Sequence, residues 1–265
     1  MKNSFNVICM DPPWNFADKL QMSDVARGAI ANYNTLSIPD IKKLSIKNLA
    51  SPDGAILALW TPSSLLQEGL DVMKEYGFHH KQTYVWVKTK KQPLDTLATW
   101  VKKILLKSQA PLDIKGATSS LIKEIGSFNV NSILSMNMGR LFRQTHEICL
   151  LGTNNTKIYK LLSNKSQRSV SFAENLKHSA KPETLQNSLE LMFPNCRKIE
   201  IFSRRQRPGW ICLGNESPMS RGEDISVSLS KVQSLTEPQY QNLLGLDNYN
   251  SLFDAWQSIN NVNVT

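Results

Sequence analysis

Long hydrophobic runs are missing from this sequence of 265 residues. The longest apolar stretches, such as Ala55 to Trp60, have the length of a buried strand and fall far short of the roughly 18 residues that a membrane span requires. The amino terminus reaches Asp11 and Pro12 before a signal-peptide core could develop, and no small-residue cleavage site follows. We therefore expect a globular, cytoplasmic protein with no membrane partner.

Cysteine is sparse as well, with four residues that occur singly. Cys9, Cys149 and Cys212 lie in apolar, β-branched runs, which predicts reduced residues in buried strands. The sequence has no Cys-x-x-Cys pair and no cluster of Cys and His at zinc spacing, so it predicts no metal site. A glycine-rich phosphate loop after a strand is also missing, so no loop motif of this kind identifies a cofactor.

Acidic residues are fewer than basic ones, 22 against 31, which gives a net charge of +9. Such an excess favours a polyanionic partner through counterion release, although the same balance also serves solubility. From Lys88 to Arg143 there are ten basic and three acidic residues, whereas residues 217–265 carry a net charge of −3. Residues 89–139 lack strand signals and contain lysine-bearing apolar stretches at 97–106 and 121–125, which predicts a basic, mostly helical insertion.

The remaining pattern predicts an α/β domain with a largely parallel sheet, because short apolar runs alternate with amphipathic helices. The expected strands are residues 5–10, 54–60, 82–88, 147–151, 198–202 and 210–213. One expected helix begins near Ser37, and two others cover residues 65–76 and 182–193. We expect this domain to occupy residues 1–216, with a polar tail at 217–265 that holds short helices, one of them capped by Thr236.

The tetrapeptide Asp11-Pro12-Pro13-Trp14 follows the first expected strand and carries recognisable chemistry. The amino group of adenine is a poor nucleophile because its lone pair is delocalised into the ring. A carboxylate and a carbonyl fixed between prolines can each accept one N–H and so direct that lone pair toward an electrophilic methyl group. Trp14 could stack on a flipped-out base. The alternative is a plain turn whose tryptophan packs into the core.

Motifs in a common order and spacing make the chain similar to the DPPW-type amino-methyltransferase family, also called the MT-A-seventy family, which includes the messenger-RNA adenosine methyltransferases. The resemblance covers residues 5 to 216 apart from the insertion. It rests on Asp11 to Trp14, Tyr33 in Asn-Tyr-Asn-Thr-Leu, Leu59-Trp60, Trp86-Val87-Lys88-Thr89, His146-Glu147, Lys181-Pro182-Glu183, Ile199 to Arg204, Pro208-Gly209-Trp210 and Gly214-Asn215-Glu216.

The resemblance implies a Rossmann-like fold for S-adenosylmethionine-dependent methyl transfer, circularly permuted so that the catalytic Asp11 to Trp14 precedes the cofactor strand 198–202. The residues it implies at the cofactor are Asp11, Lys181, Phe202, Arg204, Asn215 and Glu216. Each has a structural alternative: a solvated side chain for Lys181, a surface charge for Arg204 and a plain turn for Asn215-Glu216. For His146-Glu147 an ion pair or a core hydrogen bond is the alternative to a catalytic role, and His146 is not among the expected catalytic residues.

We expect substrate to be bound by residues of the motifs and of the insertion. These are Trp14, Tyr33, Lys88, Lys90, Lys91, Lys102, Lys103 and Lys107. The lysines of the insertion would contact phosphates and set affinity without reading bases. A solvated helical face or a docking surface for a protein partner is the alternative for these lysines.

The resemblance implies an adenine-N6 methyltransferase of nucleic acid. DNA is favoured over RNA, since RNA-targeting extensions are missing and a basic insertion, longer than the linker of the RNA-methylating relatives, takes their place. Adenosine-N6 methylation of RNA, cytosine amino-methylation and a non-catalytic subunit that binds nucleic acid are the alternatives. A homodimer or a heterodimer with a related subunit is also compatible with the family.

Overall fold

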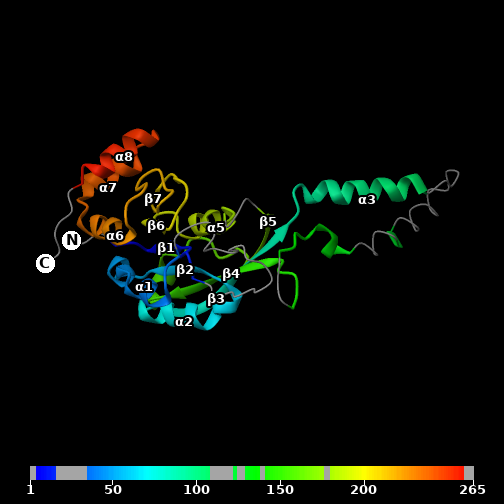
Figure 1. Ribbon diagram of the computed structural model, residues 1–265, viewed down its shortest axis with the longest axis horizontal. Helices are drawn as coiled ribbons and strands as arrows, with labels where there is room; N and C mark the ends of the chain where they lie inside the picture. The colour runs from blue at the N-terminus through cyan, green and yellow to red at the C-terminus, as the bar shows by residue number, and fades with distance from the viewer. Residues whose placement is uncertain are drawn as a thin grey trace, which may run out of the picture. The chain divides into compact units, whose positions relative to one another are not determined.

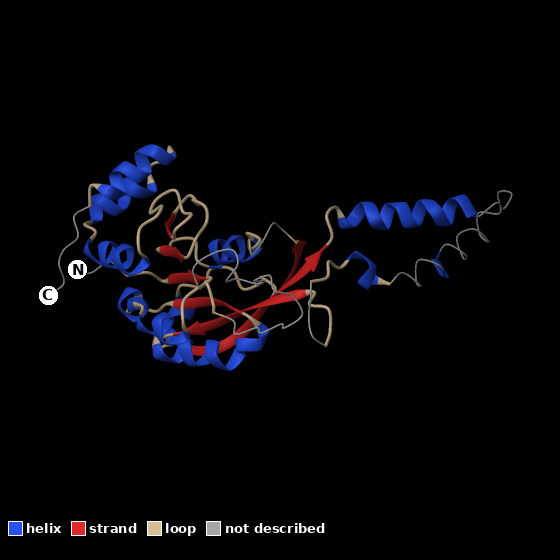
Figure 2. Ribbon diagram, in the orientation of Figure 1, coloured by secondary structure: helices blue, strands red, loops and turns tan. Residues whose placement is uncertain are grey.

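The computed structural model describes residues 4–15, 35–107, 122–123, 129–137, 141–175 and 180–259. Its strands form a seven-stranded, mostly parallel sheet in the order β5-β3-β4-β2-β1-β6-β7 (Figure 2). This mixed α/β architecture confirms the predicted fold class. The strands are β1 (Val7–Met10), β2 (Ile56–Thr61), β3 (His79–Thr89), β4 (His146–Thr153), β5 (Val170–Glu174), β6 (Lys198–Ile201) and β7 (Trp210–Leu213).

Helices connect these strands where the sequence has capping signals and amphipathic periodicity. Ser37 caps the first helix by accepting from the backbone N–H of Asp40, and Thr236 and Gln239 form the predicted capping box. The helices are α1 (Ile38–Lys43), α2 (Leu66–Glu75), α3 (Pro93–Lys107), α5 (Thr184–Met192), α6 (Ile225–Ser234), α7 (Glu237–Leu244) and α8 (Tyr249–Gln257). The described residues also form the short 3₁₀ helices η2 (Ser45–Leu49), η3 (Ser63–Leu65), η4 (Val130–Ile133) and η5 (Thr156–Lys160).

The chain divides into two compact units. The first unit consists of Met1–Tyr84, Ile148–Ser169 and Leu185–Thr265, and the second of Val85–Glu147 and Val170–Thr184. Strands β3 and β4 each contribute residues to both units.

Strand β1 lies at the centre of the first unit. All four of its residues are buried, since β2 and β6 pair with it in parallel on either side, with Ile8 opposite Leu57 and Ile199. Continuous apolar runs are typical of such doubly covered strands. Helices α1 and α2 lie along one face of this unit's sheet and α5 lies on the opposite face (Figure 1). The three cysteines predicted to be core residues are buried and unbridged: Cys9, Cys149 and Cys212.

The polar C-terminal segment packs into the same core as β1. Its helices α6, α7 and α8 have a polar average composition but direct a few large side chains inward. Glu223 joins two of these helices by accepting hydrogen bonds from Ser228, Lys231 and Trp256. The residues of this segment in the hydrophobic core are Met219, Leu229, Val232, Leu235, Tyr240, Leu243, Leu252, Trp256 and Ile259.

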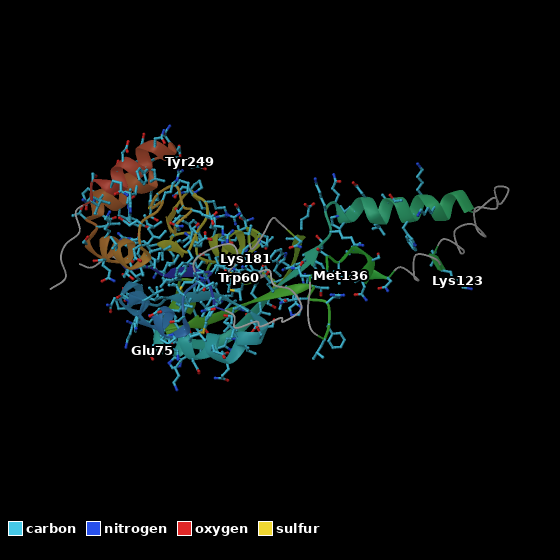
Figure 3. The ribbon with its side chains drawn as sticks, in the orientation of Figure 1. Trp60, Glu75, Lys123, Met136, Lys181 and Tyr249 are labelled. Carbon is cyan, nitrogen blue, oxygen red and sulfur yellow. The ribbon has the colours of Figure 1, made fainter. Side chains whose placement is uncertain are left out.

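The second unit contains the part of the insertion that the structure describes. Helix α3 follows β3 and includes the predicted helical stretch 97–106, whereas of the stretch 121–125 only residues 122 and 123, which are helical, belong to the described residues. The backbone N–H of Lys90 donates to Ile133, and that of Ser135 donates to Lys88, so the two ends of the insertion meet. Met136 lies near this junction and Lys123 lies far along the insertion (Figure 3).

Candidate functional site

Strands β1, β6 and β7 of the first unit run parallel and therefore end at the same edge of the sheet. Residues 11–15, 202–207 and 214–217 follow these three strand ends. The sheet also continues from β1 toward β2 on one side and toward β6 on the other. Ligands of open α/β sheets bind at the carboxyl ends of the strands, where the strand order changes direction in this way. This edge is therefore the candidate active site.

The segment after β1 is held by backbone hydrogen bonds. The N–H of Asp11 donates to Ile201 at 3.3 Å, which ties the start of the segment to β6. The carbonyl of Pro12 accepts from the N–H of Trp14, and that of Pro13 accepts from Leu36, each at 2.8 Å. A carbonyl oxygen has two lone pairs, so both prolines keep capacity for a second donor. Asp11 is half-buried at the head of this rigid turn.

The ring of Trp14 is buried, with 3% of the residue exposed. Its Nε1 donates to the backbone carbonyl of Trp60 at 2.9 Å, and its side chain belongs to the hydrophobic core. This geometry fits the packing alternative for Trp14. A role as stacking platform for a base stays a prediction.

The segment after β6 packs tightly against the segment after β7. Phe202 has a φ of 67°, a left-handed conformation that is rare outside glycine and recurs at functional sites. The next residue, Ser203, donates its N–H to Leu213 at 2.7 Å. A Cβ at Gly214 would lie 2.2 Å from the carbonyl oxygen of Ser203, so this approach requires glycine.

Three residues expected at the cofactor come together at this edge. Arg204 Nε lies 3.7 Å from Glu216 Oε1, and Asn215, which directly precedes Glu216, is exposed. The loop that carries Arg204 is anchored further along by Arg207, whose guanidinium donates to both carboxylate oxygens of Glu190 at 2.6 and 2.9 Å. These hydrogen bonds hold the pKa of Glu190 below its ordinary value. The anchored loop gives the polar side chains a fixed backbone.

A buried carboxyl lies on β6 and was not anticipated from the sequence. Burial, and to a lesser extent the charge of Asp11, raises the pKa of Glu200, although Arg205, Gln186 and Arg207 act in the opposite direction. Gln186 Nε2 donates to Glu200 Oε1 at 3.1 Å. Within the described structure, Glu200 Oε2 and Gln186 Oε1 have no hydrogen-bond partner. A protonated Glu200 has the hydrogen that this arrangement lacks.

In the second unit, Glu147 bridges two lysines. Lys88 Nζ lies 2.6 Å from Glu147 Oε1, and Lys181 Nζ lies 3.2 Å from Glu147 Oε2. The side chains of Lys88, Lys181 and Glu147 are only 5, 13 and 25% exposed. Burial tends to raise the pKa of Glu147, but the positive charges of Lys181 and Lys88 outweigh it and lower that pKa. The cluster therefore carries a net charge of +1 in a sheltered position.

Of the alternatives open for His146-Glu147, the structure shows an ion pair at Glu147, whereas His146 is exposed. It also places the ammonium group of Lys88, expected at the substrate, against Glu147 and away from solvent. Sequence reasoning did not connect the three residues, although Lys88, Glu147 and Lys181 each belong to a recognised motif. Their separation along the chain concealed the contact.

The predicted phosphate-binding lysines are only partly described. Lys90, Lys91, Lys102 and Lys103 are exposed, and Lys90 Nζ donates to the carbonyl of Ser132. Lys107 ends α3, but its side chain and all of Tyr33 lie outside the described residues.

No group of three or more His, Cys, Asp or Glu among the residues that the structure describes is arranged to hold a metal ion. Across the same residues, no helix has both the length and the apolar character needed to cross a bilayer.

Comparison with known proteins gives a family match and several relatives. The MT-A70 family model matches residues 5–132 and 121–216. An N(6)-adenosine-methyltransferase MT-A70-like protein of Drosophila melanogaster is 24% identical over 216 residues, which cover 80% of this chain and 27% of the relative. The catalytic subunit METTL3 of the Homo sapiens N(6)-adenosine-methyltransferase is 23% identical over 214 residues, covering 80% of this chain and 28% of the relative.

A relative from a Mycoplasma species matches over most of its own length. The Type II methyltransferase M.MunI is 21% identical over 237 residues, which cover 84% of this chain and 82% of the relative. By contrast, the chain aligns with only about a quarter of the length of the three relatives from Drosophila, rice and Arabidopsis, 23 to 27%.

Proposed function

The chain belongs to the MT-A70 family, and from this premise we propose that it transfers a methyl group from S-adenosylmethionine to the N6 amino group of adenine in DNA. The observation that carries the proposal is the position of Asp11 and the two proline carbonyls at the carboxyl end of β1, beside the polar residues that follow β6 and β7. Hydrogen-bond acceptors fixed at a sheet switch point suit the activation of an amine beside a bound cofactor.

The side chains at this edge fit S-adenosylmethionine by their chemistry. The cofactor presents a ribose diol, a carboxylate and an ammonium group. Asn215 and Glu216 can pair with hydroxyl groups, and the guanidinium of Arg204 is suited to a carboxylate. Lys181, which the family resemblance implies at the cofactor, belongs to the second unit. When bound, the cofactor supplies a methyl group on a sulfonium, which is an electrophile. The net positive charge of the cluster of Lys88, Glu147 and Lys181 supports the binding of an anionic group in the second unit.

The protein's part in the reaction is to orient the nucleophile. The carboxylate of Asp11 accepts one N–H of the adenine amino group, and the free lone pair of a proline carbonyl accepts the other. The nitrogen lone pair then points out of the ring plane, and a bound S-adenosylmethionine would supply the methyl group to it. The proton leaves afterwards from the cationic nitrogen, so no base is required before the attack.

DNA is the proposed polymer because of the Type II methyltransferase, which the chain matches over most of that relative's length. The alignment covers 82% of the Type II methyltransferase but only about a quarter of the N(6)-adenosine-methyltransferases. The larger shared length supports a substrate like that of the Type II methyltransferase. The basic stretch from Lys88 to Arg143 supports a polyanionic substrate of either kind. RNA methylation is the second candidate. The proposal also includes a homodimer or a heterodimer with a related subunit. It includes, too, a circularly permuted fold in which the catalytic segment precedes the cofactor strand.

The test is methyl transfer from radiolabelled S-adenosylmethionine to DNA that lacks adenine methylation and, separately, to RNA. We expect labelled N6-methyladenine in DNA, identified after digestion to nucleosides. Asp11→Asn keeps the size of the side chain but replaces an acceptor oxygen with a donor, and it should lower turnover at least about a hundredfold while cofactor affinity stays within about tenfold. Asp71→Asn, an exposed residue of α2, is the matched control and should leave both values unchanged.

The outcomes separate the alternatives. Label in RNA alone would support an RNA methyltransferase, and label in cytosine would support cytosine amino-methylation. An inactive wild-type protein that still binds nucleic acid would support the non-catalytic subunit. Undiminished turnover by Asp11→Asn would remove Asp11 from the mechanism.

A further inference from the structure

Leu141 and Phe142 have the most exposed large hydrophobic side chains among the described residues, at 94 and 88%. They are neighbours in sequence and are followed by exposed Arg143. The backbone behind them is held in place, since Asn137 and Gln144 exchange two hydrogen bonds at 2.9 and 3.2 Å. Two adjacent apolar side chains are thus presented to solvent on a backbone that is held in place, a feature that marks an interaction site.

The tip formed by Leu141 and Phe142 leads directly into the cluster of Lys88, Glu147 and Lys181 in the second unit. Lys88 donates its N–H to the carbonyl of Thr145 at 2.8 Å, and Glu147 follows two residues later in β4. Glu147 lies five positions after Phe142, and an extended chain covers at most about 18 Å over that distance. The tip and the cluster therefore lie within one DNA diameter of each other.

We propose that Leu141 and Phe142 form a wedge that enters the base stack of duplex DNA when the target adenine leaves it. The proposal rests on the proposed function, because an amino group inside a duplex can be methylated only after its base is extruded. Extrusion leaves a gap in the stack, and apolar side chains are known to insert between base steps of duplex DNA. A leucine and a phenylalanine at adjacent positions provide the apolar volume and the flat ring that this task needs.

Charge complementarity selects DNA over a protein or a lipid tail as the occupant. The tip belongs to the stretch from Lys88 to Arg143, in which basic residues exceed acidic ones by seven. Arg143 beside the wedge and exposed lysines such as Lys91 and Lys102 can pair with phosphates on either side of the opened step. A wedge that belongs to a basic stretch of the chain fits an apolar stack enclosed by phosphates.

The test compares duplex with single-stranded substrate, using the full chain. The variant L141A/F142A and the wild type are assayed on adenine-unmethylated phage DNA, native or heat-denatured, and duplex affinity is measured at the same salt. We expect turnover on duplex DNA to fall about tenfold or more, because a lost wedge raises the cost of extrusion. Turnover on denatured DNA should stay within about twofold and duplex affinity within about threefold. Phe142→Trp should retain duplex turnover.

Leu191→Ala is the matched control, since it removes an exposed apolar side chain from α5 of the other unit. It should behave as the wild type on both substrates. Unchanged duplex turnover by L141A/F142A would overturn the wedge, as would an equal loss on both substrates or a loss explained by affinity alone. A change from dimer to monomer in light scattering would assign the tip to a contact between copies instead. A wild type that methylates neither form of DNA would contradict the proposed function itself, and this result is visible without any variant.

Discussion

The indole nitrogen of Trp14 donates a hydrogen bond to the backbone carbonyl of Trp60 at 2.9 Å, and this contact joins the segment after β1 to the end of β2. Since Asp11 begins the same rigid turn, the position of the proposed catalytic carboxylate depends on a buried side chain that never needs to touch the substrate.

Replacing Trp14 separates a packing role from a stacking role. Trp14→Phe keeps an aromatic face but removes the N–H, so a buried carbonyl loses a donor. We expect the free energy of unfolding to fall by about 1 to 3 kcal/mol, and by about 3 to 5 kcal/mol for Trp14→Ala, as measured by urea denaturation. If Trp14 stacks on a base instead, Trp14→Phe should be as stable as the wild type, and Trp14→Leu should lose only DNA affinity.

Neutralising Glu147 should leave two lysines facing each other in a sheltered position. We expect Glu147→Gln to lower the free energy of unfolding by about 3 kcal/mol near neutral pH, because Lys88 and Lys181 then lack their counter-charge. The exposed neighbour His146 provides the control, and His146→Gln should change stability by less than about 0.5 kcal/mol.

The effect of Glu147→Gln should also depend on pH. The pKa of Glu147 is lowered in the folded protein, so its contribution to stability is present above the ordinary carboxyl pKa and is lost as pH falls through the folded value. Wild type and variant should therefore converge in acid. If the difference in free energy of unfolding between wild type and variant stayed constant as pH fell through the folded pKa of Glu147, the ion-pair cluster would be contradicted.

Glu200 should give the opposite pH dependence. Its pKa is raised, mainly by burial, so the folded state keeps a proton that the unfolded chain releases, and stability declines as pH rises above the ordinary carboxyl pKa. Glu200→Gln imitates the neutral form and can exchange two hydrogen bonds with Gln186. We expect its stability relative to the wild type to grow with pH, by roughly 1.4 kcal/mol for each unit of the pKa shift.

Thermal unfolding of the wild type and of Glu200→Gln in buffers of different pH tests this prediction. Glu75→Gln removes a carboxylate from the exposed surface of α2 and is the control, with a pH profile close to that of the wild type. A Glu200→Gln variant that is less stable than the wild type at every pH would show that Glu200 is ionised in the folded protein.

The exposed lysines of the insertion should control the salt dependence of DNA binding. We expect the triple change of Lys91, Lys102 and Lys103 to Gln to weaken binding to all sequences alike and to reduce the slope of log affinity against log salt by about 2 to 3. Filter binding across a salt series measures the slope. The same change at the exposed Lys43, Lys74 and Lys157 of the first unit is the control, and an equal effect there would remove the special role of the insertion.

The sequence predicted the elements whose burial follows from their local pattern. Strand β1 and helix α2 lie close to their expected positions because continuous and periodic apolar runs report burial directly. Strand β5 was missed, since this edge strand leaves Val170 and Phe172 exposed and has no clear alternation of its own. Helix α6 was missed because it buries Ser228 and Lys231, whose polar groups are satisfied by Glu223 from outside the helix.

The candidate site was predictable where its residues are consecutive. Asp11 to Trp14 can be recognised as one unit because the chemistry and the turn lie in four adjacent residues. The roles of Glu147 and Glu200 were not predictable, since each depends on a partner brought close by the fold: lysines 59 and 34 positions from Glu147, and a glutamine 14 positions from Glu200. No periodicity in the sequence records such distances.

The closed junction of the insertion has a consequence for the length of that segment. Lys90 bonds to Ile133 and Lys88 bonds to Ser135, so the intervening chain leaves and re-enters the sheet at nearly the same point. Lengthening a loop whose ends already meet costs little entropy, about 0.6 kcal/mol for each doubling. The segment can therefore change in length at little entropic cost while the strands and the Asp11 turn keep their structure.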